Sequence, residues 1–318
     1  MQIRAATLDD VERLAAFMGR CTLAHQGVRR DSPAEIRQRL TRPGTDPALD
    51  SWLIEEDEEV IAFAQAWREE AASVGYVRVD PAERGRGLAT RLLARTSRRA
   101  RELGSTTLHT TSWPKDDAAA PFLEGHGFRP IRYLSLMTID LEGAPEAPEA
   151  PGRPLARGED LRPVFEAVRA VFPEQQSLEA WLHDYEDADP TIWFVVEDES
   201  GIAGFALCLP KLDEDPEAGY VAELGVREDR RGQGLGLALL RQTFVEFRRR
   251  GKRRVSLHVD VDNLTGAFRL YEKAGMTPDP RLVVLQCSGH VARDNAWIVE
   301  KVFAASERGP RRPSGSSL

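Results

Sequence analysis

Cysteine is scarce in this sequence, and its scarcity limits the sites that the chain can build. The 318 residues include three cysteines, Cys21, Cys208 and Cys287. They are odd in number and far apart, so they form neither a disulfide framework nor the ligand spacing of a zinc site. We therefore expect no metal site, and we expect the thiols to be buried and unreactive.

Long apolar runs and positive net charge are also missing. No stretch approaches about 18 consecutive apolar residues, which is the length of a membrane-spanning helix. Residues 1–14 lack the charged and then apolar layout of an export signal. The formal net charge of −8 argues against general nucleic-acid binding. The sequence therefore predicts a cytoplasmic protein that binds neither membranes nor nucleic acid.

Segments of the first half recur in the second half in the same order. Residues 3–21 resemble residues 153–172, and residues 51–67 resemble residues 192–209. The longest match is VGYVRVDPAERGRGLATRLLARTSRRARELG against VAELGVREDRRGQGLGLALLRQTFVEFRRRG. Self-similarity at so long a period indicates a duplicated domain, because the units of a solenoid are much shorter.

The boundaries between these domains follow from composition. The segment from residue 141 to 152 has repeated prolines and almost no apolar side chain to bury, which is typical of a linker. The residues after Val302 are equally unable to form a core. We predict an N-terminal domain at 1–142, a linker at 143–153, a C-terminal domain at 154–304 and a disordered tail at 305–318.

The order of elements in each copy predicts the fold class. Each copy has a strand, one or two helices, three strands, a helix, a strand, a helix and a final strand or strands. This order indicates an α/β fold with two tandem domains, each a mixed central β-sheet with helices on both faces. A hairpin within residues 278–299 supplies the last strands in this interpretation.

A glycine-rich turn, Arg231-Gly232-Gln233-Gly234-Leu235-Gly236, follows a predicted strand and opens a predicted helix. Its backbone N–H groups can converge on a phosphate at the positive end of the helix. Gly234 and Gly236 permit close approach, and Arg231 can add a charge-assisted contact. Without a ligand, the same pattern is simply a tight turn. The counterpart in the first copy is Arg84-Gly85-Arg86-Gly87-Leu88-Ala89.

A second motif follows about 35 residues downstream. Asp262-Asn263 precedes the segment Leu270-Tyr271-Glu272-Lys273-Ala274-Gly275-Met276. Together with the turn, it resembles the GCN5-related N-acetyltransferase (GNAT) family, whose pyrophosphate-binding motif is Arg/Gln-x-x-Gly-x-Gly/Ala and whose later helix carries an Asn and a Tyr. The resemblance covers nearly the whole chain. It implies two GNAT-type domains and an N-acyltransferase that moves the acyl group of acetyl-CoA directly to a primary amine of a small molecule.

The resemblance also implies how acetyl-CoA (coenzyme A) is bound. In this family the fourth and fifth strands splay apart, and the pantetheine arm enters between them. The positions that match the family's binding motif are a strand end and a turn in each copy: Leu224, Val226, Arg231, Gly232, Gln233, Gly234, Leu235 and Gly236 in the second, and Val79, Arg84, Gly85, Arg86, Gly87, Leu88 and Ala89 in the first.

Three residues of the second copy match the family's catalytic positions. Glu223 precedes the turn, and strand alternation puts it with Val221 and Gly225 on one face. The resemblance makes Glu223 the base that takes a proton from the amine, through water, whereas the alternative is an acid on a solvated face. Tyr271 would protonate the departing thiolate or be a core aromatic, and Asn263 would contact the pantetheine or that tyrosine, or act as a helix N-cap.

Two further residues of the second copy are candidate bases. Asp260 is a weaker candidate than Glu223. His258 alternates with apolar neighbours, which is more typical of a packed residue.

The first copy departs from these positions. Tyr76 stands opposite Glu223, Pro114 or Lys115 stands opposite Asn263, and Leu123 stands opposite Tyr271. We therefore predict that the N-terminal domain is non-catalytic, with a structural or regulatory role. We also expect a monomer in which the two domains form an intramolecular pseudo-dimer.

The sequence does not identify the acyl acceptor. Acidic segments at 172–190 and 210–219 favour a cationic amine, although they also suit plain solvated loops. A tandem pair with its activity in the second copy is also similar to the mycothiol synthases, which acetylate a cysteinyl pseudodisaccharide. Outside the enzymes, the alternatives are a non-catalytic acyl-CoA sensor and a protein-interaction module that acts on peptide N-termini.

Overall fold

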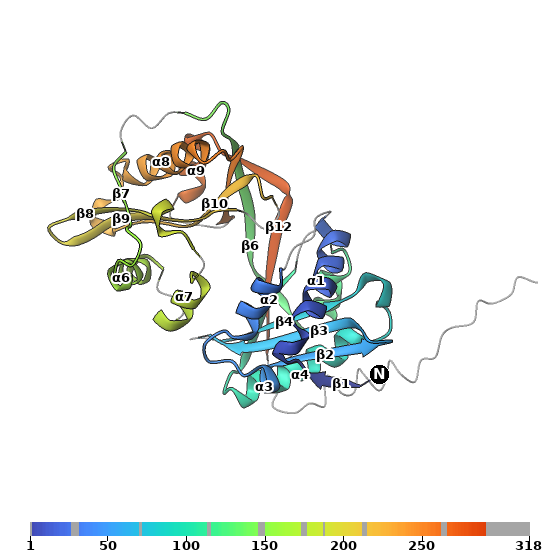
Figure 1. Ribbon diagram of the computed structural model, residues 1–318. Helices are drawn as coiled ribbons and strands as arrows, with labels where there is room; N and C mark the ends of the chain where they lie inside the picture. The colour runs from blue at the N-terminus through green and yellow to red at the C-terminus, as the bar shows by residue number, and fades with distance from the viewer. Residues whose placement is uncertain are drawn as a thin grey trace, which may run out of the picture. The chain divides into compact units, whose positions relative to one another are not determined.

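The computed structural model describes residues 2–26, 32–69, 72–112, 116–145, 150–172, 177–186, 188–211, 215–261 and 266–290 (Figure 1). The chain divides into two compact units. The first comprises Met1–Thr110, Phe122–Arg129 and Ser288–Leu318, and the second comprises Thr111–Pro121 and Pro130–Cys287. Both are α/β units with a mixed sheet, as predicted from the order of elements.

The first unit is built on a sheet in the order β1-β2-β3-β4-β5. Neighbouring strands from β1 to β4 are antiparallel, and β4 is parallel to β5. The strands are β1 (Ile3–Ala5), β2 (Ser51–Glu56), β3 (Glu59–Arg68), β4 (Ser73–Val79) and β5 (Thr107–Ser112). The helices are η1 (Leu8–Asp10), α1 (Val11–Gln26), α2 (Pro33–Leu40), α3 (Pro47–Asp50), η2 (Pro81–Glu83), α4 (Leu88–Glu102) and α5 (Ala119–Gly125).

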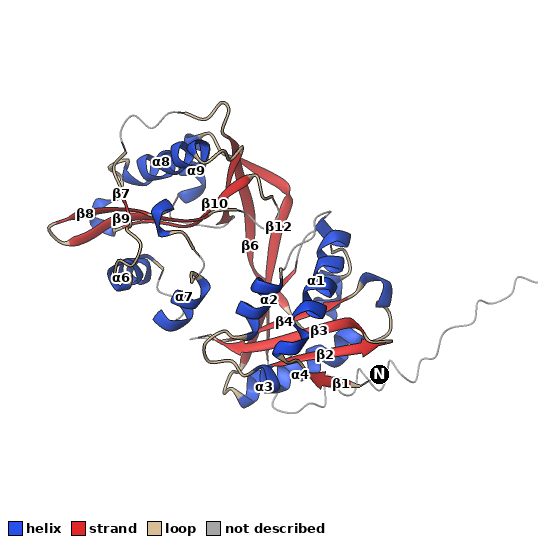
Figure 2. Ribbon diagram, viewed as in Figure 1, coloured by secondary structure: helices blue, strands red, loops and turns tan. Residues whose placement is uncertain are grey.

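Helices cover both faces of this sheet (Figure 2). On one face, apolar side chains of α1 and α2 such as Leu14 and Ile36 pack with Phe63 of β3. On the other face, Leu92 of α4 packs with Trp52 and Ile54 of β2. The alternation of β2 and β3 therefore supplies two separate cores, which is why both strands are almost continuously buried.

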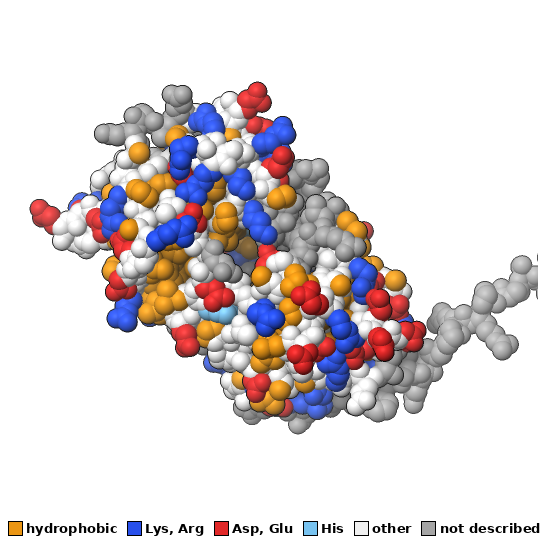
Figure 3. All heavy atoms as spheres, viewed as in Figure 1, with side chains coloured by type: hydrophobic (Ala, Val, Ile, Leu, Met, Phe, Trp, Pro, Cys, Tyr) orange, Lys and Arg blue, Asp and Glu red, His pale blue; other side chains and the backbone are white. Residues whose placement is uncertain are grey.

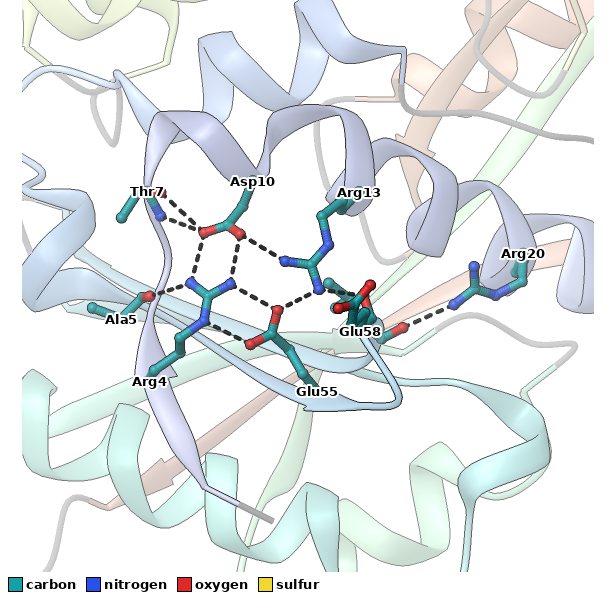
Figure 4. Close-up of polar contacts among 9 residues, drawn as sticks. Arg4, Ala5, Thr7, Asp10, Arg13, Arg20, Glu55 and Glu58 are labelled. Carbon is teal, nitrogen blue, oxygen red and sulfur yellow. Dashed lines mark hydrogen bonds and ion pairs between the residues drawn. The ribbon is translucent and has the colours of Figure 1, made fainter.

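A cluster of ion pairs ties the start of α1 to the sheet (Figure 4). Arg4 of β1 contacts Asp10 at 2.6 Å and Glu55 of β2 at 2.7 Å. Arg13 of α1 pairs with the same two carboxylates, and the backbone N–H of Thr7 donates to Asp10. These donors hold the pKa values of Asp10 and Glu55 below their usual range, because each favours the charged carboxylate.

The second unit has a sheet in the order β12-β6-β11-β10-β9-β8-β7. Among the pairs from β6 to β7, β10 and β11 are parallel and the others antiparallel. The strands are β6 (Arg129–Asp140), β7 (Arg153–Pro154), β8 (Phe194–Asp198), β9 (Gly201–Leu209), β10 (Ala218–Val226), β11 (Arg254–Asp260) and β12 (Thr277–His290). The helices are α6 (Arg162–Val171), α7 (Leu178–Asp184), η3 (Pro190–Ile192), η4 (Glu228–Arg230), α8 (Leu235–Arg249) and α9 (Ala267–Ala274).

The helices of this unit also lie in two layers. Helices α8 and α9 lie on one face of the sheet, and α6 and α7 lie on the other (Figures 1 and 2). The buried positions of α8 include Leu240, Phe244 and Phe247, which recur at helical spacing and face the sheet. The face that bears α6 and α7 is lined by aromatic side chains, among them Trp181 and Phe205.

Strand β6 completes the sheet of the second unit. It pairs antiparallel with β11 from Arg254↔Asp140 to Asp260↔Leu134. Residues 130–140 fall within the predicted N-terminal domain, so the boundary predicted at residue 142 does not coincide with the division into compact units. Strand β12 is a single strand from residue 277 to 290, and the second arm of the predicted hairpin lies outside the described residues.

The predicted linker is more strongly anchored than its composition indicates. Ala144, near the start of the linker, is buried in the core of the second unit, as is Leu141 just before the linker. Farther along, the amide of Gln242 bonds both backbone groups of Gly152, accepting from its N–H at 2.9 Å and donating to its carbonyl at 2.7 Å. Residues 146–149 and the predicted tail lie outside the described residues.

The two cysteines with described side chains, Cys21 and Cys208, are buried and not bonded to each other. Burial raises the pKa of Cys21 to about 12 and raises that of Cys208 further above its usual value, so both are thiols at neutral pH. Within the described ranges, no helix has the length and apolar character needed to cross a membrane. Acidic and basic side chains are interspersed on the face drawn in Figure 3.

Candidate active site

The turn after β10 has the geometry of an anion-binding turn. Gly232 and Gly234 have φ values of +75° and +83°, which only glycine adopts without strain. Helix α8 begins directly after Gly234, and no side chain caps its first N–H groups. The N-terminal turn of α8 therefore offers unpaired backbone donors at the positive end of the helix dipole.

The turn after β4 repeats this geometry in the first unit. Gly85 and Gly87 have φ values of +79° and +73°, and α4 begins directly after Gly87 without a side-chain cap. The difference lies in the side chain between the glycines. Arg86 of the first turn pairs with Glu56 and Glu83, whereas Gln233 of the second donates to the carbonyl of Asp229 at 3.4 Å.

The strands before and after each turn part from one another. Pairing between β10 and β11 ends at Tyr220↔Ser256, although β10 continues to Val226 and β11 to Asp260. Pairing between β4 and β5 ends at Val74↔His109. Each unit therefore has the splay between its fourth and fifth strands that the family resemblance implies.

The splay leaves backbone groups of β10 exposed to the opening. The N–H of Arg227 donates to Ala203 on the β9 side. Because successive N–H groups of a strand point to alternate edges, the N–H of Val226 points to the opposite edge, where β11 has already parted from β10. The carbonyl of Val226 accepts a hydrogen bond from Nε of Arg231 at 3.1 Å.

A β-bulge interrupts β10 directly before Glu223. Val221 pairs with Cys208 and Glu223 with Leu207, so Ala222 is an extra residue on β10. The predicted grouping of Val221 with Glu223 is therefore wrong: the bulge puts Val221 on the α8 face and Glu223 on the α7 face. Gly225 does share the face of Glu223, since the space beside it is filled by Phe205. Strand β4 pairs with β3 in regular register and has no such bulge.

Glu223 is half-buried on the α7 face, between two aromatic donors. Nε1 of Trp181 donates to Oε1 of Glu223 at 3.4 Å, and the hydroxyl of Tyr185 also hydrogen-bonds to the carboxylate. Burial raises the pKa of Glu223 to about 7, and the hydrogen bonds from Trp181 and Tyr185 offset part of that rise. Such a carboxyl can accept and release a proton near neutral pH.

Tyr271 lies on α9 and is 8% exposed, in the same core cluster as Trp181. Burial raises its pKa to about 12, so the hydroxyl is protonated at neutral pH. Asn263 lies outside the described residues. The structure thus describes two of the three predicted catalytic side chains.

The weaker candidates on β11 are engaged elsewhere. Asp260 forms an ion pair with Arg132 at 2.9 Å. Nδ1 of His258 and the hydroxyl of Tyr220 are 3.0 Å apart. His258 is therefore a hydrogen-bonded strand residue.

The remaining residues predicted to bind the cofactor fall into two groups. Those of the turns are Arg84, Gly85, Arg86, Gly87, Arg231, Gly232, Gln233 and Gly234, and those of the flanking strands and helices are Val79, Leu88, Ala89, Leu224, Val226, Leu235 and Gly236. Several of the second group also have packing roles. Leu88 is buried, Leu224 packs near Leu235, and a Cβ atom at Gly236 would lie 3.1 Å from Leu270 of α9.

In the first unit, the position opposite Glu223 holds an aromatic ring between two cations. The guanidinium groups of Arg39 and Arg78 lie 4.6 Å and 4.5 Å from the ring centre of Tyr76. The hydroxyl of Tyr76 contacts Sδ of Met18 at 3.7 Å. Leu123, opposite Tyr271, is buried, and Pro114 and Lys115 lie outside the described residues.

Sequence reasoning did not identify Trp181 and Tyr185. They lie in the segment 172–190, whose most evident feature in the sequence is its acidic residues. The two aromatic residues are four positions apart, a spacing that places two side chains on one helix face. That spacing was the available signal. In the described part of the chain, no group of three His, Cys, Asp or Glu side chains could hold a metal ion.

Comparisons with known proteins agree with this architecture. The model of the acetyltransferase (GNAT) family matches residues 20–128 and 159–276. The mycothiol acetyltransferase of Geodermatophilus obscurus is 30% identical over 291 residues, which cover 86% of this chain and 88% of the relative. That of Thermobispora bispora is 30% identical over 241 residues, which cover 71% of this chain and 79% of the relative.

Two solved structures are similar over both units. A GCN5-related N-acetyltransferase from Sphaerobacter thermophilus superimposes with a TM-score of 0.73 at 29% identity, covering 91% of this chain and 95% of the other. A tandem GNAT protein from the clavulanic acid biosynthesis pathway has a TM-score of 0.68 at 18% identity, covers 92% and 99% of the two chains, and shows the fold alone. The chain therefore belongs to the acetyltransferase (GNAT) family, carries two GNAT domains in tandem and is an acyltransferase.

Proposed function

We propose that the protein is an acetyl-CoA-dependent N-acetyltransferase that acts on a primary amine of a small molecule, with its active site in the C-terminal domain. The observation that carries this proposal is Glu223. It is a half-buried carboxyl whose pKa is raised to about 7, on a bulged strand at the edge of the opening between β10 and β11. A base with this pKa suits the removal of a proton from an ammonium group at neutral pH.

The donor would be held by the turn and the splayed strand. The uncapped N-terminus of α8, with Gly232 and Gly234 before it, suits the pyrophosphate of acetyl-CoA. The outward N–H of Val226 suits the thioester oxygen, on which negative charge develops during attack. The fit rests on the positive-φ glycines and the uncapped amides.

The chain's own groups would move the protons. Glu223 takes a proton from the acceptor ammonium, and the resulting amine attacks the thioester carbonyl. Tyr271, which is protonated at neutral pH because of its raised pKa, would give its proton to the departing thiolate. Asn263 remains a predicted contact to the pantetheine or to Tyr271.

The N-terminal domain would be non-catalytic. Its fourth strand lacks the bulge, and Tyr76 between Arg39 and Arg78 replaces the carboxyl. Its turn keeps the left-handed glycines, so this half can bind the phosphates of a second coenzyme A without transferring its acyl group. A monomer with an intramolecular pseudo-dimer and a cytoplasmic location remain predictions.

The similarity to mycothiol acetyltransferases favours a second, more specific candidate, acetylation of a cysteinyl pseudodisaccharide. The acidic segments carry less weight than their composition indicates, because Asp189 pairs with Arg157 and Arg250 and Asp215 pairs with Arg254. We therefore propose the acceptor only as a class, small molecules with a primary amine.

The test is turnover of acetyl-CoA by the full chain with a panel that includes the cysteinyl pseudodisaccharide, simple amines and aminoglycosides. Release of free coenzyme A with at least one amine is expected. Turnover with none of them, together with retained acetyl-CoA binding, would instead support an acyl-CoA sensor. Native mass spectrometry, which counts coenzyme A molecules per chain, distinguishes one occupied turn from two.

A further inference from the structure

Helix α7 and its C-cap residue present two hydrogen-bond donors to the carboxylate of Glu223. Trp181 of α7 and Tyr185, the C-cap, are four residues apart, which places their side chains on the same side of the helix. Trp181 donates to Oε1, and Tyr185 hydrogen-bonds to the same carboxylate. The other oxygen, Oε2, is buried and has no hydrogen-bond partner among the described residues.

The donors are held by aromatic packing that does not involve Glu223. The ring centres of Trp181 and Tyr185 are 5.0 Å apart, and Tyr185 meets Trp193 edge-on at 5.0 Å. Phe165 lies 5.6 Å from Trp181 on the other side. Trp193 is itself anchored, since its Nε1 donates to the carbonyl of Cys208 at 2.8 Å. Aromatic packing thus fixes the positions of both donors independently of the carboxylate.

The two oxygens of Glu223 are consequently unequal. A buried acceptor without a partner is unfavourable, and it gains a partner when a donor reaches it. A protonated primary amine carries three N–H donors, as a lysine side chain does. Such a group can donate a hydrogen bond to Oε2.

We propose that Trp181 and Tyr185 are positioning residues that hold the carboxylate of Glu223, Trp181 through Oε1, so that Oε2 receives the ammonium group of the acceptor. This inference rests on the proposed acetyltransferase function. In the step that follows, one N–H bond of the ammonium breaks and an O–H bond forms at Oε2. The products are a neutral amine, whose lone pair can attack, and a neutral carboxyl.

The surroundings of Glu223 make the prediction specific. The causes of its raised pKa are burial, opposed by the two hydrogen bonds, and no charged side chain is among them. The charged and titratable groups that act on Tyr185 are Glu223 itself, Tyr220 of β10 and Asp184 of α7. His258 of β11 faces Tyr220. Removing either donor should therefore raise the pKa of Glu223, because it removes a hydrogen bond that lowers this pKa.

The experiment compares Trp181→Phe and Tyr185→Phe with Trp67→Phe in the full chain. Each change removes one N–H or O–H donor and leaves an aromatic ring, but the indole of Trp67 in the first unit bonds Glu69 instead of Glu223. The pH dependence of kcat/KM for the amine is measured from about pH 5 to about pH 9, with KM for acetyl-CoA alongside. We expect the acid limb to move up by about one pH unit in the first two variants, which is roughly a tenfold loss on that limb, recovered at high pH. KM for acetyl-CoA should hardly change.

Two results would overturn the inference. One is an acid limb that stays in place in both Trp181→Phe and Tyr185→Phe, and the other is an equal shift in Trp67→Phe. Glu223→Gln, which should have no acid limb, assigns that limb to Glu223 and not to His258. For a variant that folds but turns over too slowly, infrared titration of the carboxyl band that Glu223→Gln lacks must show a raised midpoint. A wild-type protein without turnover refutes the proposed function, whereas wild-type turnover with unshifted limbs refutes this inference alone.

Discussion

Phe205 fills the space that a side chain at Gly225 would need. A Cβ atom at Gly225 would lie 2.2 Å from Cζ of Phe205. Phe205 is buried and meets Phe172 edge-on, with ring centres 6.4 Å apart. The ring therefore has little room to retreat, and the glycine allows the far end of the ring to approach β10 two residues after Glu223.

We expect Gly225→Ala to destabilise the protein by about 1–3 kcal/mol, which is the usual cost of overpacking a core. Displacement of Phe205 should also lower turnover, because it lies on the same sheet face as Glu223. Thermal unfolding and kcat measure the two effects. Gly143→Ala is the control, since a Cβ atom there meets nothing within 4 Å. Equal melting temperatures for the two variants would contradict the packing argument.

The raised pKa of Glu223 predicts the pH dependence of activity. In the free enzyme the base must be ionised, so kcat/KM should fall below about pH 7, where the carboxyl becomes protonated. Glu223→Gln should lower kcat by about 10²–10⁴-fold and remove this acid limb. Acetyl-CoA affinity, measured by calorimetry, should be retained. A full acid limb in Glu223→Gln would show that another group is the base.

The same pKa predicts a pH dependence of stability. Because folding raises the pKa from 4.5 to about 7, the folded state favours the neutral carboxyl. The contribution of Glu223 to the stability of the folded protein is fully present below the pKa of this carboxyl in the unfolded chain. It is lost as the pH rises through the pKa in the folded protein. The free energy of unfolding of Glu223→Gln, taken relative to that of wild type, should therefore be higher at pH 8 than at pH 4 by up to about 3 kcal/mol. Denaturant unfolding at the two pH values measures the difference, and a constant difference would contradict burial of the charged group.

Tyr271 should be needed for turnover but not for binding. Tyr271→Phe removes the proposed proton donor to the thiolate and leaves the buried ring in place, so kcat should fall by about 10²-fold or more with little change in acetyl-CoA affinity. Since its pKa is about 12, ionisation of Tyr271 should not depress the rate of wild type up to about pH 10. Tyr133→Phe, at an exposed tyrosine of β6, is the control. Unchanged turnover in Tyr271→Phe would leave this residue a core aromatic.

Local sequence features predicted the elements that depend on local interactions. The glycines of the two turns were identified from their spacing, and they have the left-handed φ values that residues with a Cβ atom avoid. Helix α8 could be predicted because its apolar residues recur with the helical period, and the duplication fixed the order of strands in both copies. The α/β class followed from this order and is confirmed.

Features that depend on distant contacts could not be predicted in this way. The extra residue at Ala222 has no local signal, yet it reverses the alternation of β10 and separates Val221 from Glu223. The pairing of β6 with β11 joins residues more than a hundred positions apart. Trp181 contacts Glu223 only because α7 packs on the sheet. The side chains that surround the candidate base therefore required the tertiary structure.

The matched turns offer a test of which copy carries the chemistry. Gly234→Ala and Gly87→Ala place a Cβ atom at φ values of +83° and +73°, and in neither case would that atom meet a neighbour within 4 Å. Both changes introduce a similar backbone strain of about 1–2 kcal/mol, because left-handed φ is unfavourable for alanine. Relief of that strain would turn the first N–H groups of the following helix away from a bound phosphate.

Gly234→Ala should therefore weaken acetyl-CoA binding and lower kcat/KM together, whereas Gly87→Ala should leave turnover near the wild-type value. Native mass spectrometry should show one coenzyme A fewer per chain in each variant whose turn is occupied in wild type. Loss of turnover in Gly87→Ala with normal turnover in Gly234→Ala would move the active site to the N-terminal domain, where Tyr76 stands in the place of the base.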